Sequence, residues 1–119
     1  MPKFGCRCGY TISLVASPSP HEASLIFAPD FDKLSNKRAA AIDAFLEAVR
    51  EGKRNEWITE FYGWPQFGIS DGSIIDDIIT QEDVFSLSIV ICPECGRLYR
   101  QRQHGVNEYE CYLSEPTDE

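Results

Sequence analysis

Four cysteines in two closely spaced pairs are the residues of this chain whose types and spacing predict chemistry. The first pair is Cys6 and Cys8, the second pair is Cys92 and Cys95, and a glycine follows each pair. Each pair offers two thiolates to the same ion, and four thiolates suit a tetrahedral metal site. A glycine can adopt a positive φ, which lets the chain reverse and lets backbone N–H groups point at the sulfurs. The spacing therefore predicts a metal centre.

The two cysteine segments resemble the knuckles of a zinc ribbon. The patterns are Cys-x-Cys-Gly near the start of the chain and Cys-Pro-x-Cys-Gly-Arg near its end, and the resemblance covers about residues 1–16 and 84–113. It implies one structural Zn²⁺ held by all four cysteines, with no position open for the water that a catalytic zinc needs. The chain departs from a minimal ribbon in two ways. Only one residue separates the first two cysteines, and 83 residues separate the knuckles.

Other interpretations of the cysteines stay open at this point. Iron can occupy similar knuckles in place of zinc. The cysteines could also be ordinary buried thiols, or Cys92 and Cys95 could form a redox dithiol. That pair has the required spacing, but no helix N-terminus is expected beside it to lower the thiol pKa. The fifth cysteine, Cys111, is expected to be a buried free thiol that shares a hairpin face with Tyr109 and Leu113.

The elements that must position the cysteines indicate an α+β fold. A chain of 119 residues with 43% hydrophobic residues is expected to form a single domain, 1–119. We expect an antiparallel β core formed by both chain ends, with a helical insertion of about residues 30–80 packed on it. The expected strands lie at 10–15, 25–28, 84–91, 97–101 and 108–113.

Apolar periodicity predicts the helices of the insertion. Residues 36–51 repeat apolar side chains at helical spacing, at Ala39, Ile42, Phe45, Leu46 and Val49. We expect Ser35 or Asn36 to cap this helix and Gly52 to end it. A second helix is predicted at 56–62 with Asn55 as its cap. Residues 73–79 suit a short helix after a turn at 71–72, although four isoleucines leave a strand possible.

Charge is spread unevenly along the chain. The net charge is −8, and residues 55–96 contain eight acidic residues and no Lys or Arg. Four thiolates with one divalent ion would bring the net charge to about −10. Nucleic-acid binding draws its affinity from Lys and Arg, so this charge disfavours it. The start of the chain has no apolar leader and the longest apolar run is short, so we expect a cytoplasmic protein with no membrane segment.

An aromatic-rich segment beside the acids is the candidate partner site. Residues 57–67 contain five aromatic side chains, which either pack in the core or are exposed as anchors for a protein partner. Acidic residues nearby would complement a basic partner, or would simply be a solvated surface. The candidate contacts are Tyr62, Trp64, Phe67, Asp71, Asp76 and Asp77.

No catalytic motif is found in the sequence. His21 and His104 stand in no metal or nucleophile spacing, and no phosphate loop is present. We therefore expect a non-enzymatic zinc-binding protein that binds a basic protein partner. Its size, acidity and layout resemble small bacterial immunity proteins, which implies an inhibitor role. The alternative is a nucleic-acid- or transcription-associated zinc-ribbon adaptor that uses Arg7, Arg97, Arg100 and Arg102.

Overall fold

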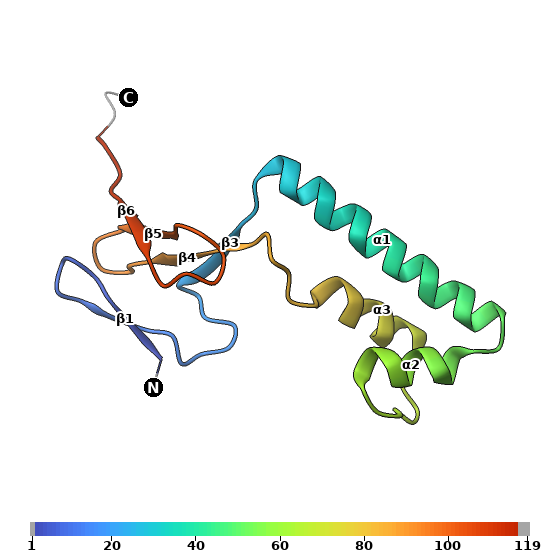
Figure 1. Cartoon of the computed structure of the whole chain (residues 1–119). Coiled ribbons are helices and arrows are strands. Elements are labelled where there is room, and N and C mark those ends of the chain that lie inside the picture. Colours follow the sequence, from blue (N-terminus) through green and yellow to red (C-terminus); the bar gives the residue numbers. More distant parts are fainter. Residues whose placement is uncertain (1, 117–119) are drawn as a thin grey trace. The chain divides into compact units, whose positions relative to one another are not determined.

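The structure, a computed structural model, describes residues 2–116 and has a mixed α+β fold (Figure 1). The chain forms two compact units. The sheet unit contains the described residues up to Phe27 and from Val84 onward, and the helical unit is Ala28–Asp83. Both sheets of the sheet unit are antiparallel, and the larger one combines a strand from the N-terminal end with three from the C-terminal end, which confirms the predicted fold class.

The sheet unit contains a hairpin and a four-stranded sheet. The hairpin pairs β1 (Lys3–Gly5) with β2 (Thr11–Ser13). The larger sheet has the order β3-β4-β5-β6, so each strand pairs with the next along the chain. Its strands are β3 (Glu22–Leu25), β4 (Leu87–Ile91), β5 (Leu98–Gln101) and β6 (Tyr109–Tyr112). The first cysteine pair follows β1, and the second pair lies between β4 and β5.

One predicted strand was placed wrongly. The apolar run at 25–28 suggested a strand, but β3 ends at Leu25 and a helix begins at Ala28. The strand is the more polar stretch before that run, because its backbone pairs with β4 from Glu22 opposite Val90 to Leu25 opposite Leu87. Edge strands need fewer apolar side chains than central strands, so their sequence signal is weak.

The core of the sheet unit includes the thiols. Cys6, Ile12, Val90, Cys92 and Tyr99 form one buried cluster, and Ile12 is fully buried within it. Partly buried side chains pack around this cluster: Phe4, Leu14, Cys95, Tyr109 and Cys111. The cluster joins the hairpin to the larger sheet at the place where the two cysteine pairs meet.

The helical unit contains three helices, α1 (Ala28–Arg50), α2 (Arg54–Tyr62) and α3 (Asp71–Thr80). The prediction that α1 begins at about residue 36 with a Ser35 or Asn36 cap was wrong, since both residues lie inside the helix. Pro29 lies in the first turn of α1, where proline is favoured because its missing N–H has no helical partner. Gly52 follows α1 with φ 72°, as predicted.

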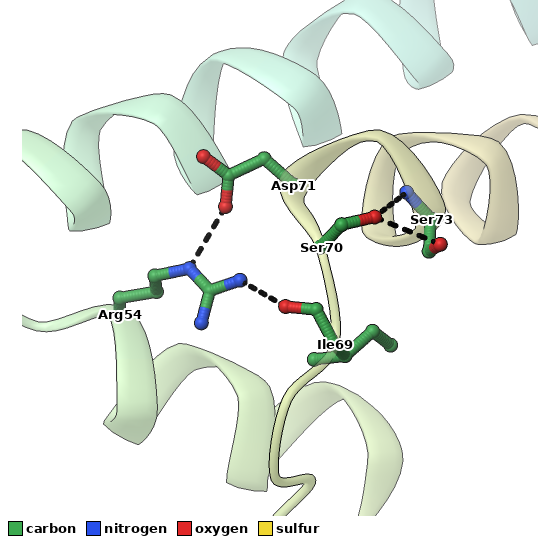
Figure 2. A network of polar contacts seen from close by, with 5 residues as sticks. All are labelled: Arg54, Ile69, Ser70, Asp71 and Ser73. Carbon is green, nitrogen blue, oxygen red and sulfur yellow. Dashed lines mark hydrogen bonds and ion pairs between the residues drawn. The ribbon is translucent and has the colours of Figure 1, made fainter.

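Helices α2 and α3 begin at residues that the sequence did not indicate. Lys53, not Asn55, precedes α2 and makes no side-chain capping bond. Ser70 caps α3, and its Oγ accepts a hydrogen bond of 3.1 Å from the Ser73 N–H (Figure 2). The expected turn at 71–72 is instead the first turn of α3, which confirms the helix over the strand alternative.

Arg54 ties the start of α2 to the start of α3. Its Nε donates to Asp71 Oδ1 at 2.8 Å and its Nη2 donates to the Ile69 carbonyl at 2.6 Å (Figure 2). Asp71 also lies in the first turn of α3, where a negative charge is favoured by the helix dipole. One guanidinium therefore fixes the loop that enters α3.

The core of the helical unit is purely apolar. Its buried members are Phe45, Ile58, Ile74 and Ile78, with Trp57 and Phe61 stacked beside them at 4.8 Å between ring centroids. The predicted inner face of α1 is partly wrong, because Ala39 and Leu46 are exposed. The helix is longer than expected, and its buried side chains are Phe45 and Leu34, of which the sequence pattern indicated only Phe45.

Candidate metal centre

The four cysteines that the sequence pairs two by two come together in the sheet unit. The Sγ atoms of Cys6, Cys8, Cys92 and Cys95 all lie within 4.8 Å of one another. Two distances cross between the pairs, at 3.5 Å from Cys6 to Cys95 and 3.7 Å from Cys8 to Cys92. All of these thiols are free. Four sulfurs gathered in this way can hold a metal ion.

The two knuckles share one backbone design. In the first, the Cys6 N–H donates to the Tyr10 carbonyl at 2.9 Å and the Gly9 N–H donates to the Cys6 carbonyl at 3.0 Å. In the second, the Cys92 N–H donates to the Arg97 carbonyl at 2.9 Å and the Gly96 N–H donates back to the Cys92 carbonyl at 3.0 Å. The extra residue of the second knuckle is thus accommodated without changing the pattern.

Both knuckle glycines have the backbone conformation that the sequence predicts. Gly9 has φ 94° and Gly96 has φ 80°, values at which a side chain would be strained. The reversal turns the next N–H toward the second sulfur of each pair, so Tyr10 N–H bonds to Cys8 and Arg97 N–H bonds to Cys95. These hydrogen bonds favour the thiolate form, which is the form that binds a metal.

Burial divides the four sulfurs into an inner and an outer pair. Cys92 is 1% exposed and Cys6 is 8% exposed, and both belong to the buried cluster. Cys8 is exposed and Cys95 is half-buried. The centre therefore lies at the edge of the core, with one side formed by protein and the other side reachable from solvent.

Tyr99 contacts one of the two inner sulfurs. Its hydroxyl donates a hydrogen bond of 3.3 Å to Cys6 Sγ and accepts one of 2.9 Å from the Arg7 N–H. Burial raises the pKa of Cys6, but hydrogen bonds from Tyr99 and from the Cys8 backbone outweigh burial and lower that pKa to about 6. Burial, followed by the bond to Cys6, raises the pKa of Tyr99 to about 12.

The outer sulfurs differ in their electrostatics. The Tyr10 N–H favours the Cys8 thiolate, but desolvation and the adjacent thiols outweigh it and raise the pKa of Cys8 to about 12. The pKa of Cys95 is lowered, first by the backbone N–H of Arg97 and also by its guanidinium. The Cys95 thiol therefore loses its proton more easily than usual and the Cys8 thiol less easily, because neighbouring negative sulfurs repel one another. A central cation would relieve this repulsion.

The basic residues near the knuckles have different surroundings. The pKa of Arg97 is raised, chiefly by its hydrogen bond to Cys95, so this guanidinium offsets thiolate charge. Arg100 Nη2 instead pairs with Glu110 at 3.0 Å, and Arg102 lies 3.8 Å from the same carboxylate. The side chains of Lys3 and Arg7 are exposed. Of these five basic residues, Arg97 is the one with a hydrogen bond to a sulfur.

Cys111 is half-buried and lies beside the centre. It pairs with Tyr99 across β5 and β6 and packs against the buried cluster together with Tyr109. Full burial was expected and is not found, and Leu113, expected on the same face, is 55% exposed. Strand β6 is an edge strand that ends at Tyr112, so Leu113 lies outside the pairing.

The aromatic segment of the helical unit divides into core and surface. Trp57, Phe61 and Tyr62 pack against the apolar core, and the Tyr62 hydroxyl donates to Asp77 Oδ2 at 2.5 Å. Trp64 is 64% exposed and Phe67 is 95% exposed. Both lie in the loop between α2 and α3, which we call the aromatic loop (residues 63–70).

The candidate acids are also in different situations. Asp71 is paired with Arg54, and Asp77 accepts from Tyr62. Asp76 is exposed on α3. The helical unit therefore brings Tyr62 and Asp77 into one internal contact and leaves Trp64, Phe67 and Asp76 facing solvent.

A family profile covers all of the described chain. The profile of the Domain of unknown function DUF8617 matches residues 2–116. The chain belongs to this family. The match runs through both units, so the cysteine knuckles and the helical insertion between them are parts of one family domain.

A similarity to a larger protein is also found. The chain is 27% identical over 125 aligned positions to the fatty acid oxidation complex subunit alpha of Ectopseudomonas oleovorans. The alignment covers 91% of this chain but 17% of that relative, so the chain spans about a sixth of the relative's length. No solved structure matches the chain significantly.

Sequence reasoning missed Tyr99. The residue was read only as part of a strand leaving the second knuckle. The alternation along β5 could have indicated its inward position, since Leu98 and Arg100 flank it and it lies four residues after Cys95. Its contact with Cys6, 93 positions away, is visible only in the folded chain.

Proposed function

We propose that this protein is a zinc-binding, non-enzymatic member of its family whose four cysteines hold one structural Zn²⁺ in a ribbon-like centre. The observation that most directly supports this proposal is the arrangement of the four sulfurs. A tetrahedral zinc with bonds of about 2.3 Å to sulfur has sulfur–sulfur edges of about 3.8 Å. The distances of 3.5 and 3.7 Å between the two pairs are close to that edge.

The donor set supports a structural metal in place of a catalytic one. Four thiolates complete a tetrahedral shell, so no position is left for a reacting water. Thiolate donors also select zinc or iron over harder ions such as Mg²⁺ or Ca²⁺. Zinc is the proposal, and iron is the alternative that metal analysis decides.

Metal analysis of a ligand variant tests this centre. Purified protein should contain about one zinc ion per chain, and Cys95→Ser should lose it, because three thiolates bind zinc far more weakly than four. Cys111→Ser is the matched control, since it removes a thiol that packs beside the cluster without belonging to the four. Unchanged zinc in Cys95→Ser would contradict the ligand assignment, and iron in its place would correct the metal.

We further propose that the protein acts by binding a basic protein partner through the aromatic loop. Large aromatic side chains dominate the energetics of protein interfaces, and Trp64 and Phe67 are exposed there. A hollow of about 270 Å³ lies beside Phe67, lined also by Asn55, Ile58, Thr59, Pro65 and Gln66. The absence of Lys and Arg from residues 55–96 supports a partner of positive charge.

The surroundings of the arginines favour a protein partner over a nucleic acid. Arg100 and Arg102 both lie near Glu110, and Arg97 is directed to a cysteine. Charges already neutralised within the protein release few counterions from a phosphate backbone. A transcription-associated adaptor would need these guanidinium groups available, so it remains the second candidate.

An inhibitor of a basic toxin, as in bacterial immunity proteins, is one form of the proposed function. Such an inhibitor would act in the cytoplasm, where cysteines are normally reduced. No helix in the described part of the chain is long and apolar enough to cross a bilayer.

Quantitative pull-down from the source cell with matched variants tests the partner site. A protein of basic isoelectric point should be recovered with the wild-type chain and lost with Trp64→Ala/Phe67→Ala. Leu113→Ala is the control, because it removes an apolar side chain that is also more than half exposed, from the sheet unit. Recovery that is equal with all three proteins would contradict the assignment. A salt-dependent shift of labelled DNA or RNA would favour the adaptor instead.

A further inference from the structure

We infer that Tyr99 is a positioning residue of the metal centre, holding the Cys6 thiolate by a hydrogen bond and joining the two knuckles. The inference rests on the proposed metal function and deepens it. It assigns a part of the centre that is neither a cysteine nor a glycine.

The hydrogen bonds of the hydroxyl fix its direction. The Arg7 N–H can only donate, so at 2.9 Å the Tyr99 oxygen must be the acceptor. The single hydroxyl hydrogen is then free to point to Cys6 Sγ, 3.3 Å away. Arg7 stands between the two cysteines of the first knuckle, whereas Tyr99 belongs to the strand that leaves the second. One oxygen therefore connects the two knuckles.

The ring is held on several sides. Tyr99 is 6% exposed, and its ring lies 4.8 Å from the ring of Phe4. Within the sheet it is paired with Val90 on β4 and with Cys111 on β6. A ring packed in this way has little freedom, so the hydroxyl stays beside the sulfur without a large loss of side-chain entropy on metal binding.

This contact comes from a side chain, as does the Arg97 guanidinium contact of Cys95, and it differs from the backbone contacts of the knuckle turns. Cys8 and Cys95 each receive a backbone N–H, from Tyr10 and from Arg97, which any sequence with the same turn would supply. Cys6 also receives a side-chain hydroxyl, which depends on the residue type at position 99. Hydrogen bonds to a thiolate lower the energy of its lone pairs, so Tyr99 is expected to tune the Cys6–metal bond as outer-shell groups do in other metal sites.

The test compares Tyr99→Phe with the wild-type protein after exchange of the metal for Co²⁺. Loss of the hydroxyl should raise the energy of the sulfur lone pairs and move the thiolate-to-cobalt charge-transfer band to longer wavelength. Zinc affinity, measured by competition with a chromophoric chelator, should fall about 10-fold. Tyr109→Phe is the control, because Tyr109 packs against the same cluster and contacts the ring of Phe4. Its band and affinity should equal those of the wild type.

A second variant keeps the test valid if Tyr99→Phe does not fold. Fluorinated tyrosine at position 99 keeps the ring and makes the hydroxyl a stronger donor, so the band should move to shorter wavelength. Unchanged bands in both variants of a cobalt-binding protein would overturn the role of Tyr99 and leave the metal centre standing. A wild-type protein that binds neither Co²⁺ nor Zn²⁺ would overturn the metal centre and this role with it.

Discussion

The two compact units bury different kinds of side chain. In the sheet unit, the buried cluster contains Cys6 and Cys92 beside apolar residues, and Tyr99 bonds to one of these sulfurs. In the helical unit, the four buried members are all hydrocarbon side chains. Hydrocarbon burial is favourable in water without any addition, whereas ionised sulfurs near one another repel unless a cation lies between them.

The two cores indicate a different source of stability for each unit. The strands of the sheet unit are three to five residues long, and short strands bury little surface. The helical unit combines three helices around Phe45, Ile58, Ile74 and Ile78. We therefore expect the sheet unit to depend on the proposed metal and the helical unit to depend on packing.

Metal removal should give the largest effect, and in the sheet unit. A strong chelator should destabilise that unit by several kcal/mol, because binding of a structural metal is coupled to folding. Hydrogen exchange measured by mass spectrometry should show loss of protection in β4 and β5. Both tryptophans, Trp57 and Trp64, belong to the helical unit, so their fluorescence should stay unchanged. Equal loss of structure in both units would contradict the separation.

Phe45→Ala should have the converse effect. Phe45 is fully buried at the centre of the helical unit, and truncation of such a residue costs about 3–5 kcal/mol. Urea unfolding followed by Trp57 fluorescence measures this loss, and the zinc content should remain unchanged. Leu46→Ala is the neighbouring control, since Leu46 is 39% exposed and should cost much less. Similar losses of stability for Phe45→Ala and Leu46→Ala would show that Phe45 is not at the centre of the helical core.

Two serine substitutions sharpen the account of the helix starts. Ser70→Ala removes the cap of α3 and should cost the helical unit about 1 kcal/mol. Ser35→Ala should be neutral or stabilising by about 0.5 kcal/mol, because Ser35 is exposed inside α1 and alanine is the better helix former. Thermal unfolding of the two variants measures the difference. A larger loss of stability for Ser35→Ala than for Ser70→Ala would support the caps that the sequence predicted instead.

The smallest effect is expected at alkaline pH in the helical unit. Burial, followed by the hydrogen bond to Asp77, raises the pKa of Tyr62 from 10.0 to about 12. A raised pKa in the folded state stabilises the neutral form, so this contribution is complete below about pH 10 and is lost as pH rises toward 12. Tyr62→Phe should lack this loss in urea titrations at pH 9 and pH 11. Parallel behaviour of the two proteins would contradict the contact.

Individual residues show which parts of the fold could be predicted from the sequence. The conformation of the knuckle glycines could be predicted, because a positive φ after a cysteine pair depends only on neighbouring residues. Gly9 and Gly96 both adopt it. The start of α1 was misplaced because proline stops a helix in one position and begins it in another, and local sequence alone does not tell which. The cap at Ser70 was hidden for a similar reason, since the following Asp71 and Gly72 also suit a turn.

The sequence alone was enough to predict the cysteines of the candidate metal centre, the two knuckle turns, the α+β class and the uneven charge. These features depend on residue type and on neighbours within a few positions. The tertiary structure alone decided that the sulfurs meet within 4.8 Å, that Tyr99 bonds to Cys6, and that Phe67 is exposed while Phe61 packs in the core. Such contacts join residues up to 93 positions apart. They arise when strands pair and cores close, and no local pattern records that.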